Sequence, residues 1–367
     1  MLKRAVELLN QLPEGEERYR LERDLQTGFV LTLFHIKGYG ADEVLEACDR
    51  IFSLSENLNE RSPFPVKRIY AISILVHGRI EESVQIGREL YDQAISTGDN
   101  IERVEACYVL GVTLSRQARF AEAKKFFQKG LDLYSPGDQQ EHILRFGQDP
   151  SVICMVRQAM AEWLAGDNKK SQKLGDEALQ EAIKIGHPFT LSYMKTHFAW
   201  LCNLKQDINA TFRLSEEVLA TSSDHSFPDF ISMCEILCGY SQFRLGFKEK
   251  GINGMREGLR LLDLAGVWVE RPYFSSLVAD ALSDQGEYGW KEAMAISNRA
   301  VKDSEEAGYQ WMLPEIYRIR GVIYLRKSQP DVENAQKSFR KAVSISQRHK
   351  MPFFEQRARE SLEKIVP

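Results

Sequence analysis

Apolar side chains recur along most of the chain at positions i, i+3, i+4 and i+7, and the runs break every 15 to 20 residues at Gly, Pro, Asp or Asn. This spacing places the apolar positions on one face of an α-helix. The glycines and prolines mark the turns between helices. Strand-like alternation of apolar and polar residues is nearly absent. The pattern therefore predicts an all-α protein whose helices are joined by short turns.

Six prolines open successive helical runs at intervals of 38 to 44 residues. They are Pro150, Pro188, Pro228, Pro272, Pro314 and Pro352. Proline is tolerated in the first turn of a helix because its missing N–H has no partner there in any case. A constant interval near 40 residues predicts a repeat architecture built from pairs of helices.

Small residues form a second periodicity, at intervals of 40 to 48 residues. The positions are Ala71, Gly111, Ala159, Ala199, Gly239, Ala281 and Gly321. Twelve residues after each of the first six stands another small residue, namely Ser83, Ala123, Ser171, Thr211, Gly251 and Ala293, and the seventh pair ends at Ala335 with two extra residues. Because two helices approach closely only where side chains are small, the constant offset predicts helical hairpins with short loops.

Two segments resemble the tetratricopeptide repeat (TPR). They are YVLGVTLSRQARFAEAKKFFQKGLDLYSP (108–136) and YRIRGVIYLRKSQPDVENAQKSFRKAVSIS (317–346). We therefore expect an α–α superhelix, a TPR-like solenoid of about eight helical hairpins with a C-terminal capping helix. The expected organisation is an amphipathic N-terminal helix over residues 1–20, one continuous solenoid over 21–350 and the capping helix over 351–367.

The whole chain is also similar to the C-terminal helical-repeat region of bacterial signalling proteins that join a class III adenylate/guanylate cyclase or a protein kinase to a STAND-type ATPase. The matching segments run in order and include LERDLQTGF, GYGADEV, RFGQDPSV, GHPFTLSY, REGL and RPYF. The most specific is FGQDP (146–150), after which the family usually has glycine where this chain has Ser151. The resemblance implies a regulatory module with cyclase, ATPase or kinase domains as partners.

The chain carries 48 Lys and Arg residues against 52 Asp and Glu residues, for a formal charge of −4. This balance argues against a general binder of nucleic acid or anionic membranes. No apolar stretch is long enough for a membrane span, and no signal-peptide pattern is present. The six cysteines lie far apart within apolar helical runs, as expected for core residues of a reduced, cytoplasmic protein.

Motifs that carry chemistry are missing from the sequence. There is no Gly-x-x-x-x-Gly-Lys-Ser/Thr phosphate-binding loop, so the ATPase implied by the resemblance is not encoded in this chain. No His-Glu-x-x-His or Gly-x-Ser-x-Gly occurs, and no two of the seven histidines are three or four residues apart. We expect no catalytic residue, no cofactor and no metal site.

In the TPR arrangement the first helix of each hairpin faces the concave side, through positions −6, −3, +1 and +4 from the small residue. Carried over to this chain, the rule gives a predicted partner groove of Met160, Trp163, Tyr193, Thr196, Trp200, Met233, Tyr240, Phe243 and Arg318. Aromatic residues, Met and Arg are enriched in interface cores. The alternative is a tightly wound superhelix in which these residues pack against each other, and burial of Tyr193, Trp200 and Tyr240 would decide for it.

The function expected from these observations is a non-catalytic protein–protein interaction and regulatory scaffold of a bacterial signalling ATPase or cyclase system. It would bind a partner segment or an adjacent domain in its concave groove. The alternative is a stand-alone TPR adaptor that binds a peptide, and an enzyme is the least supported reading. The sequence leaves the oligomeric state open.

Overall fold

The computed structural model describes Leu9, residues 13–221 and residues 227–365 of the chain. These residues form helices and connecting turns, with no β-strand among them. The eight hairpins of the described part are α2 (Glu16–Lys37) with α3 (Asp42–Asn57), α4 (Phe64–Val76) with α5 (Ile80–Thr97), α6 (Asn100–Arg116) with α7 (Phe120–Leu133), α9 (Pro150–Leu164) with α10 (Asn168–Ile185), α11 (Pro188–Leu204) with α12 (Ile208–Ala220), α13 (Pro228–Arg244) with α14 (Lys248–Leu264), α15 (Arg271–Leu282) with α16 (Gly286–Glu306), and α17 (Leu313–Leu325) with α18 (Val332–Arg348). The single helix α19 (Pro352–Glu363) follows the last hairpin.

The predicted TPR-like solenoid of about eight hairpins with a terminal helix is confirmed. One insertion interrupts it, because η1 (Pro136–Asp138) and α8 (Gln139–Phe146) lie between α7 and α9. This insertion accounts for the interval of 48 residues between Gly111 and Ala159, the longest in the series of small residues. The N-terminal helix expected over residues 1–20 lies largely outside the described residues, and α2 begins within that range at Glu16.

The periodic prolines all stand in the first turn of a helix, in α9, α11, α13, α15, α17 and α19. Five helix starts, including that of α9, are capped by aspartate, whose carboxylate accepts backbone N–H groups that have no partner within the helix. These caps are Asp99, Asp149, Asp167, Asp207 and Asp331. The two signals together explain why the helix starts could be located from the sequence.

All fourteen small residues of the seven pairs are buried. A Cβ built on Gly111 would lie 2.3 Å from the ring of Phe127, and one on Gly239 would lie 2.7 Å from the carbonyl oxygen of Gly251. In the first of these pairs, the Ser83 hydroxyl donates to the carbonyl of Ala71 at 2.7 Å. In the pairs Ala71–Ser83 and Gly239–Gly251, the offset of twelve residues thus corresponds to direct contact between the two helices of a hairpin.

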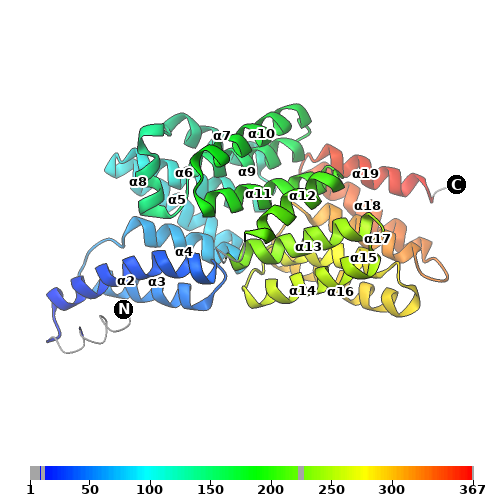
Figure 1. Ribbon diagram of the computed structural model, residues 1–367, viewed down its shortest axis with the longest axis horizontal. Coiled ribbons are helices and arrows are strands. Elements are labelled where there is room, and N and C mark those ends of the chain that lie inside the picture. The colour runs from blue at the N-terminus through cyan, green and yellow to red at the C-terminus, as the bar shows by residue number, and fades with distance from the viewer. Residues whose placement is uncertain (1–8, 10–12, 222–226, 366–367) are drawn as a thin grey trace.

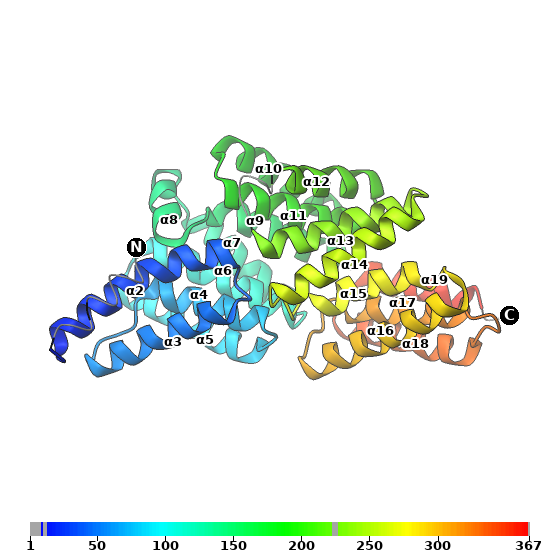
Figure 2. The same ribbon diagram turned by 60° about the horizontal axis from the view of Figure 1, so that its bottom comes forward.

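Successive turns of the superhelix also touch each other. Figures 1 and 2 show α2–α5 at one end of the long axis, α9–α12 arched over the middle and α15–α18 at the other end. The backbone N–H groups of Trp268 and Val269 both donate to the carbonyl of Val76 at 2.9 Å. A Cβ on Gly40 would lie 2.1 Å from the carbonyl oxygen of Ala265. The segment after α14 therefore closes against the first two hairpins and leaves little space along the superhelix axis.

Candidate functional site

Eight of the nine residues predicted to line a partner groove are buried inside the chain. Tyr193, Trp200 and Tyr240 are 4%, 0% and 4% exposed, and Met160, Trp163, Thr196, Met233 and Phe243 are also buried. Arg318 is partly buried. The expectation of an open aromatic groove in the middle of the array is therefore wrong, and the alternative of a tightly wound superhelix describes this region.

The closing of the superhelix explains this burial. Trp200 on α11 packs against Tyr273 of α15 and against Trp311, with ring centroids 5.4 and 5.1 Å apart. Trp163 on α9 is covered by α19, where the ring of Phe353 stacks on it at 5.2 Å. Later helices of the same chain occupy the space beside these residues.

An open concave pocket remains farther along the array, and we call it the C-terminal pocket. It has a volume of about 470 Å³ and is built by α11, α13, α15, α17 and α19, with contributions from their loops and the start of α14. Its lining residues are Asn203, Leu204, Gln206, Tyr240, Phe243, Arg244, Lys248, Tyr273, Leu277, Asp280, Asp284, Glu315, Arg318, Ile319, Val322, Arg326 and Arg357. Three predicted groove residues, Tyr240, Phe243 and Arg318, contribute to this wall.

Asp280 is the centre of one side of the C-terminal pocket. Its Oδ2 accepts the Tyr240 hydroxyl at 2.8 Å, and its Oδ1 accepts Arg326 Nη1 at 2.9 Å. Arg244 Nη1 in turn donates to the Tyr240 hydroxyl oxygen at 3.2 Å. Burial raises the pKa of Tyr240, and the charge of Asp280 raises it further, so the phenol stays neutral and acts as a donor.

Glu315 organises the opposite side of the pocket. Arg318 donates to its two oxygens through Nε at 2.9 Å and Nη2 at 2.7 Å, a bidentate pair, and Arg357 Nη1 lies 3.7 Å from the same carboxylate. Burial pushes the pKa of Glu315 upward, but the charge and hydrogen bonds of Arg318 outweigh burial and hold the pKa below its usual value. Glu315 is therefore ionised at neutral pH, and it fixes the geometry of two cations.

The C-terminal pocket carries more cations than anions. Its cationic side chains are Arg244, Lys248, Arg318, Arg326 and Arg357, and its acidic side chains are Asp280, Asp284 and Glu315. Arg244 forms no ion pair with a carboxylate in the described part of the chain. Such a pocket can hold a polar segment with carboxylate groups, because its partly exposed cations can donate to carboxylates.

Sequence reasoning missed most of these charged residues. Asp280 stands one residue before the small residue Ala281, a position outside the four offsets used for the concave face. Arg357 belongs to α19, which the repeat rule does not cover. Arg326 follows the last residue of α17, five residues after Gly321 and outside the four offsets.

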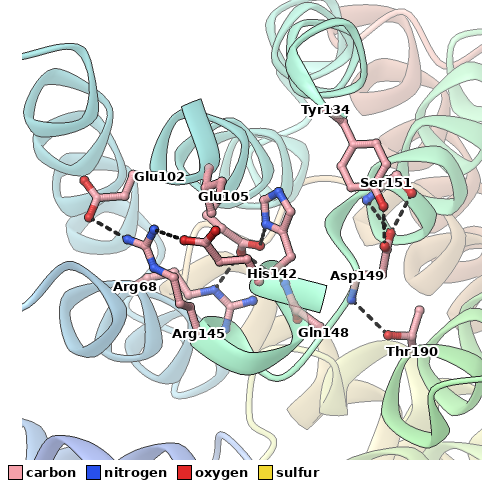
Figure 3. A network of polar contacts seen from close by, with 12 residues as sticks. Arg68, Glu102, Glu105, Tyr134, His142, Arg145, Gln148, Asp149, Ser151 and Thr190 are labelled. Atoms are coloured by element: carbon pink, nitrogen blue, oxygen red, sulfur yellow. Dashed lines mark hydrogen bonds and ion pairs between the residues drawn. The ribbon is translucent and has the colours of Figure 1, made fainter. Parts of the chain in front are cut away.

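The FGQDP segment, the most specific part of the family resemblance, is an architectural junction (Figure 3). Asp149 caps α9 by accepting the N–H groups of Ser151 and Val152 at 2.9 and 3.2 Å, and its backbone N–H donates to Thr190 Oγ1 at 3.0 Å. The side chain of Gln148 donates to Glu105 at 3.4 Å. The segment thereby joins the α8 insertion to α6, α9 and α11.

Glu105 gathers a buried charge cluster beside this junction. Arg68 Nε and His142 Nδ1 both lie 3.2 Å from its carboxylate oxygens, and Arg68 Nη1 donates to the Tyr39 hydroxyl at 2.6 Å. Arg68 and Glu105 are fully buried. The cluster lies in the interior, so we assign it to holding α4, α6 and α8 together.

The described residues contain no cluster of three or more His, Cys, Asp or Glu that could hold a metal ion. All six cysteines are buried free thiols, which confirms their prediction as small core residues. His197 is buried, and its Nδ1 lies 2.8 Å from the carbonyl of Tyr193. Burial holds the pKa of His197 well below its usual value, and the neighbouring charge of Arg157 lowers it further.

In the described part of the chain, no helix has the length and apolar character needed to cross a bilayer.

Comparison with known proteins supports the repeat assignment. Residues 104–135 match the family described as the tetratricopeptide repeat. A curated relative, an uncharacterized protein R02095 of Rhizobium meliloti (strain 1021), is 21% identical over 248 residues. This alignment covers 67% of the present chain and 24% of the relative, so the chain spans about a quarter of the relative's length.

Solved structures with the same architecture cover nearly the whole chain. A Rap protein complexed with competence and sporulation factor has a TM-score of 0.56 at 10% identity, covering 94% of this chain and 98% of the other. NprR in complex with its cognate peptide NprX has a TM-score of 0.53 at 11% identity, with coverages of 96% and 99%. A STAND protein with a tetratricopeptide repeat sensor from Pyrococcus horikoshii has a TM-score of 0.51 at 12% identity, covering 100% of this chain and 54% of that one. At these identities the likeness shows the fold alone.

Proposed function

We propose that the chain is a non-catalytic binding scaffold that holds an extended, acidic segment of a partner protein or peptide in its C-terminal pocket. The observation that carries this proposal is the pocket itself, whose wall has five cationic and three acidic side chains beside Tyr240 and Phe243. A pocket of about 470 Å³ is large enough for part of a peptide chain. The similar fold of NprR, which is solved with its cognate peptide, is consistent with this use of a TPR-like array.

In the finer form of the proposal, the chain is the sensor region of a bacterial signalling ATPase or cyclase system. The sequence resemblance supports this form, as does the likeness to a STAND protein with a TPR sensor. A relative about four times as long as the matched region is also what a multidomain parent would give. A stand-alone adaptor that binds a peptide is the second form, and it needs the same pocket without the neighbouring domains.

Peptide selection against the purified chain tests the proposal. Short random peptides are panned on the wild type, and fluorescence anisotropy then measures the Kd of each selected peptide. We expect enrichment of Asp and Glu, and at least about a tenfold loss of affinity when these are changed to Asn and Gln, equal to about 1.4 kcal/mol.

Two valine variants supply the matched comparison. Val322→Trp fills the C-terminal pocket from α17, whereas Val332→Trp adds the same side chain at an exposed position at the start of α18. Val322→Trp should abolish binding of the selected peptides, and Val332→Trp should leave their Kd unchanged. Equal binding by both variants would place the peptide elsewhere and overturn the proposal.

A further inference from the structure

A second, smaller cavity lies on the superhelix axis, where the segment after α14 closes against the first hairpins. We call it the axial cavity. It has a volume of about 60 Å³ and shares no lining residue with the C-terminal pocket. Its polar wall includes Arg116 of α6, Arg157 of α9, Tyr193 of α11, Asp229 of α13 and Glu270. Helices far apart in the sequence thus contribute charged groups to one cavity.

Arg116 is 2% exposed, and only some of its guanidinium N–H groups have a hydrogen-bond acceptor. Its Nη2 donates to Glu270, and the face of its guanidinium lies 4.1 Å from the ring centroid of Trp311. Its Nε and Nη1 are buried and donate to no acceptor among the described residues. The other carboxylate oxygen of Glu270 accepts the hydroxyl of Tyr309 at 3.0 Å.

Arg157 is the second cation of the axial cavity, and it is 8% exposed. Its Nε donates to the Tyr193 hydroxyl oxygen at 2.5 Å, and its buried Nη1 donates to nothing in the described part of the chain. None of the ion pairs found among the described residues includes Arg157. The carboxylate of Asp229 accepts the backbone N–H of Tyr39 at 3.0 Å instead.

A buried guanidinium without a counter-charge is strongly unfavourable, and buried N–H groups nearly always have acceptors. Water could accept these hydrogen bonds but would not neutralise the charge of Arg157, whereas an anion does both. A single water needs about 10–15 Å³ of such space, so the axial cavity exceeds this several-fold. The space and the donors therefore fit a compact anion better than an isolated water.

We propose that the axial cavity binds one compact monovalent anion, of halide or carboxylate-group size, held by the free N–H groups of Arg116 and Arg157. The bound anion joins α6 to α9, and Arg116 links this site to the segment that carries Glu270. Binding should therefore favour the closed superhelix, since a ligand that binds only the folded state stabilises that state.

Crystals grown with sodium bromide in place of chloride test the location of the site. Anomalous diffraction at the bromine edge should place a bromide ion within hydrogen-bond distance of Arg116 Nε or Nη1 and Arg157 Nη1. Density that fits only water at this position would overturn the proposal.

Thermal unfolding at constant ionic strength tests the effect in solution. Replacing gluconate, which is too large for the axial cavity, by chloride, nitrate or acetate should raise the Tm of the wild type by about 2 °C or more, in a saturable way. Comparing chloride with acetate distinguishes a halide site from a carboxylate site. Arg157→Met should lose this increase, and Arg299→Met, which removes an exposed arginine of α16, should retain it.

The same increase in Arg157→Met and in the wild type would mean that the salt acts elsewhere on the surface, and would contradict the site. Should Arg157→Met fail to fold, the bromide position in wild-type crystals still decides the question.

Discussion

The Oδ2 atom of Asp229 accepts the backbone N–H of Tyr39 at 3.0 Å across 190 residues of sequence. The Oδ1 atom of Asp229 lies close to Gly38, the residue before Tyr39. A Cβ on Gly38 would be 2.1 Å from this atom, and Gly38 has a positive φ of 86°. One carboxylate on α13 therefore fixes the turn between α2 and α3. Burial raises the pKa of Asp229 to about 7, against an ordinary value of 3.8.

The raised pKa of Asp229 predicts a pH dependence of stability. Between pH 4 and pH 7 the folded protein keeps the proton that the unfolded chain has lost, so the free energy of unfolding falls as pH rises through this range. At about 1.4 kcal/mol per pKa unit, the full effect is on the order of 4 kcal/mol. Urea unfolding should show that Asp229→Asn, whose amide oxygen can still accept from Tyr39, gains stability relative to the wild type as pH rises. The exposed change Asp132→Asn should track the wild type, and parallel curves for all three proteins would contradict the assignment.

The contact between Gly321 and Phe339 predicts that position 321 does not tolerate a side chain larger than that of glycine. A Cβ on Gly321 would lie 2.4 Å from the ring of Phe339, which is fully buried. Gly321→Ala should therefore lower the free energy of unfolding by about 1–3 kcal/mol, although alanine is the better helix former. Gly28→Ala in α2 is the matched control, because nothing lies within 4 Å of the added methyl group. Chemical denaturation should show that the control is unchanged or stabilised by about 0.5–1 kcal/mol.

The hairpins could be predicted because their determinants are local. Pro188 at a helix start and the pair Ala199 and Thr211 lie within one repeat, and their spacing is fixed by helix geometry and loop length. The same local register also gives the predicted direction of the Trp200 side chain. Whether that direction leads to solvent depends on how much each repeat is rotated from the next, and the sequence period does not report this rotation.

The C-terminal pocket was accessible to sequence reasoning only in part. Tyr240, Phe243 and Arg318 followed from the offsets, because they belong to first helices with a clear small residue. Arg357 could not be placed there, because α19 reaches the pocket through contacts with α9 and α17 that no repeat period encodes. The axial cavity depends entirely on such contacts between distant hairpins.

Because Trp200 is buried, we expect its replacement to lower the stability of the fold and not to act selectively on peptide binding. The ring is fully buried and lies 5.0 to 5.4 Å from the rings of Tyr273, Phe274 and Trp311. Trp200→Ala should reduce the free energy of unfolding by about 3–5 kcal/mol, the range found for large-to-small changes in cores. Denaturation and peptide binding should be measured on the same sample. If Trp200→Ala kept full stability and selectively lost peptide affinity, Trp200 would belong to the binding surface and the prediction would be wrong.

Asp149 caps α9 and also binds neighbouring side chains. We therefore expect its removal to lower the free energy of unfolding by more than removal of an ordinary helix cap. Asp149 is fully buried, and besides the two N–H groups of α9 it accepts the Tyr134 hydroxyl at 2.6 Å and the Ser151 hydroxyl at 2.6 Å. Asp149→Ala would leave these buried donors without an acceptor, so we expect a loss on the order of 3 kcal/mol in urea unfolding. Asp167→Ala removes an exposed cap that accepts a single N–H of α10, at 2.9 Å from Lys170, and should cost about 1 kcal/mol. Equal losses for the two variants would mean that the FGQDP segment acts as a helix cap and does not tie α8 to its neighbours.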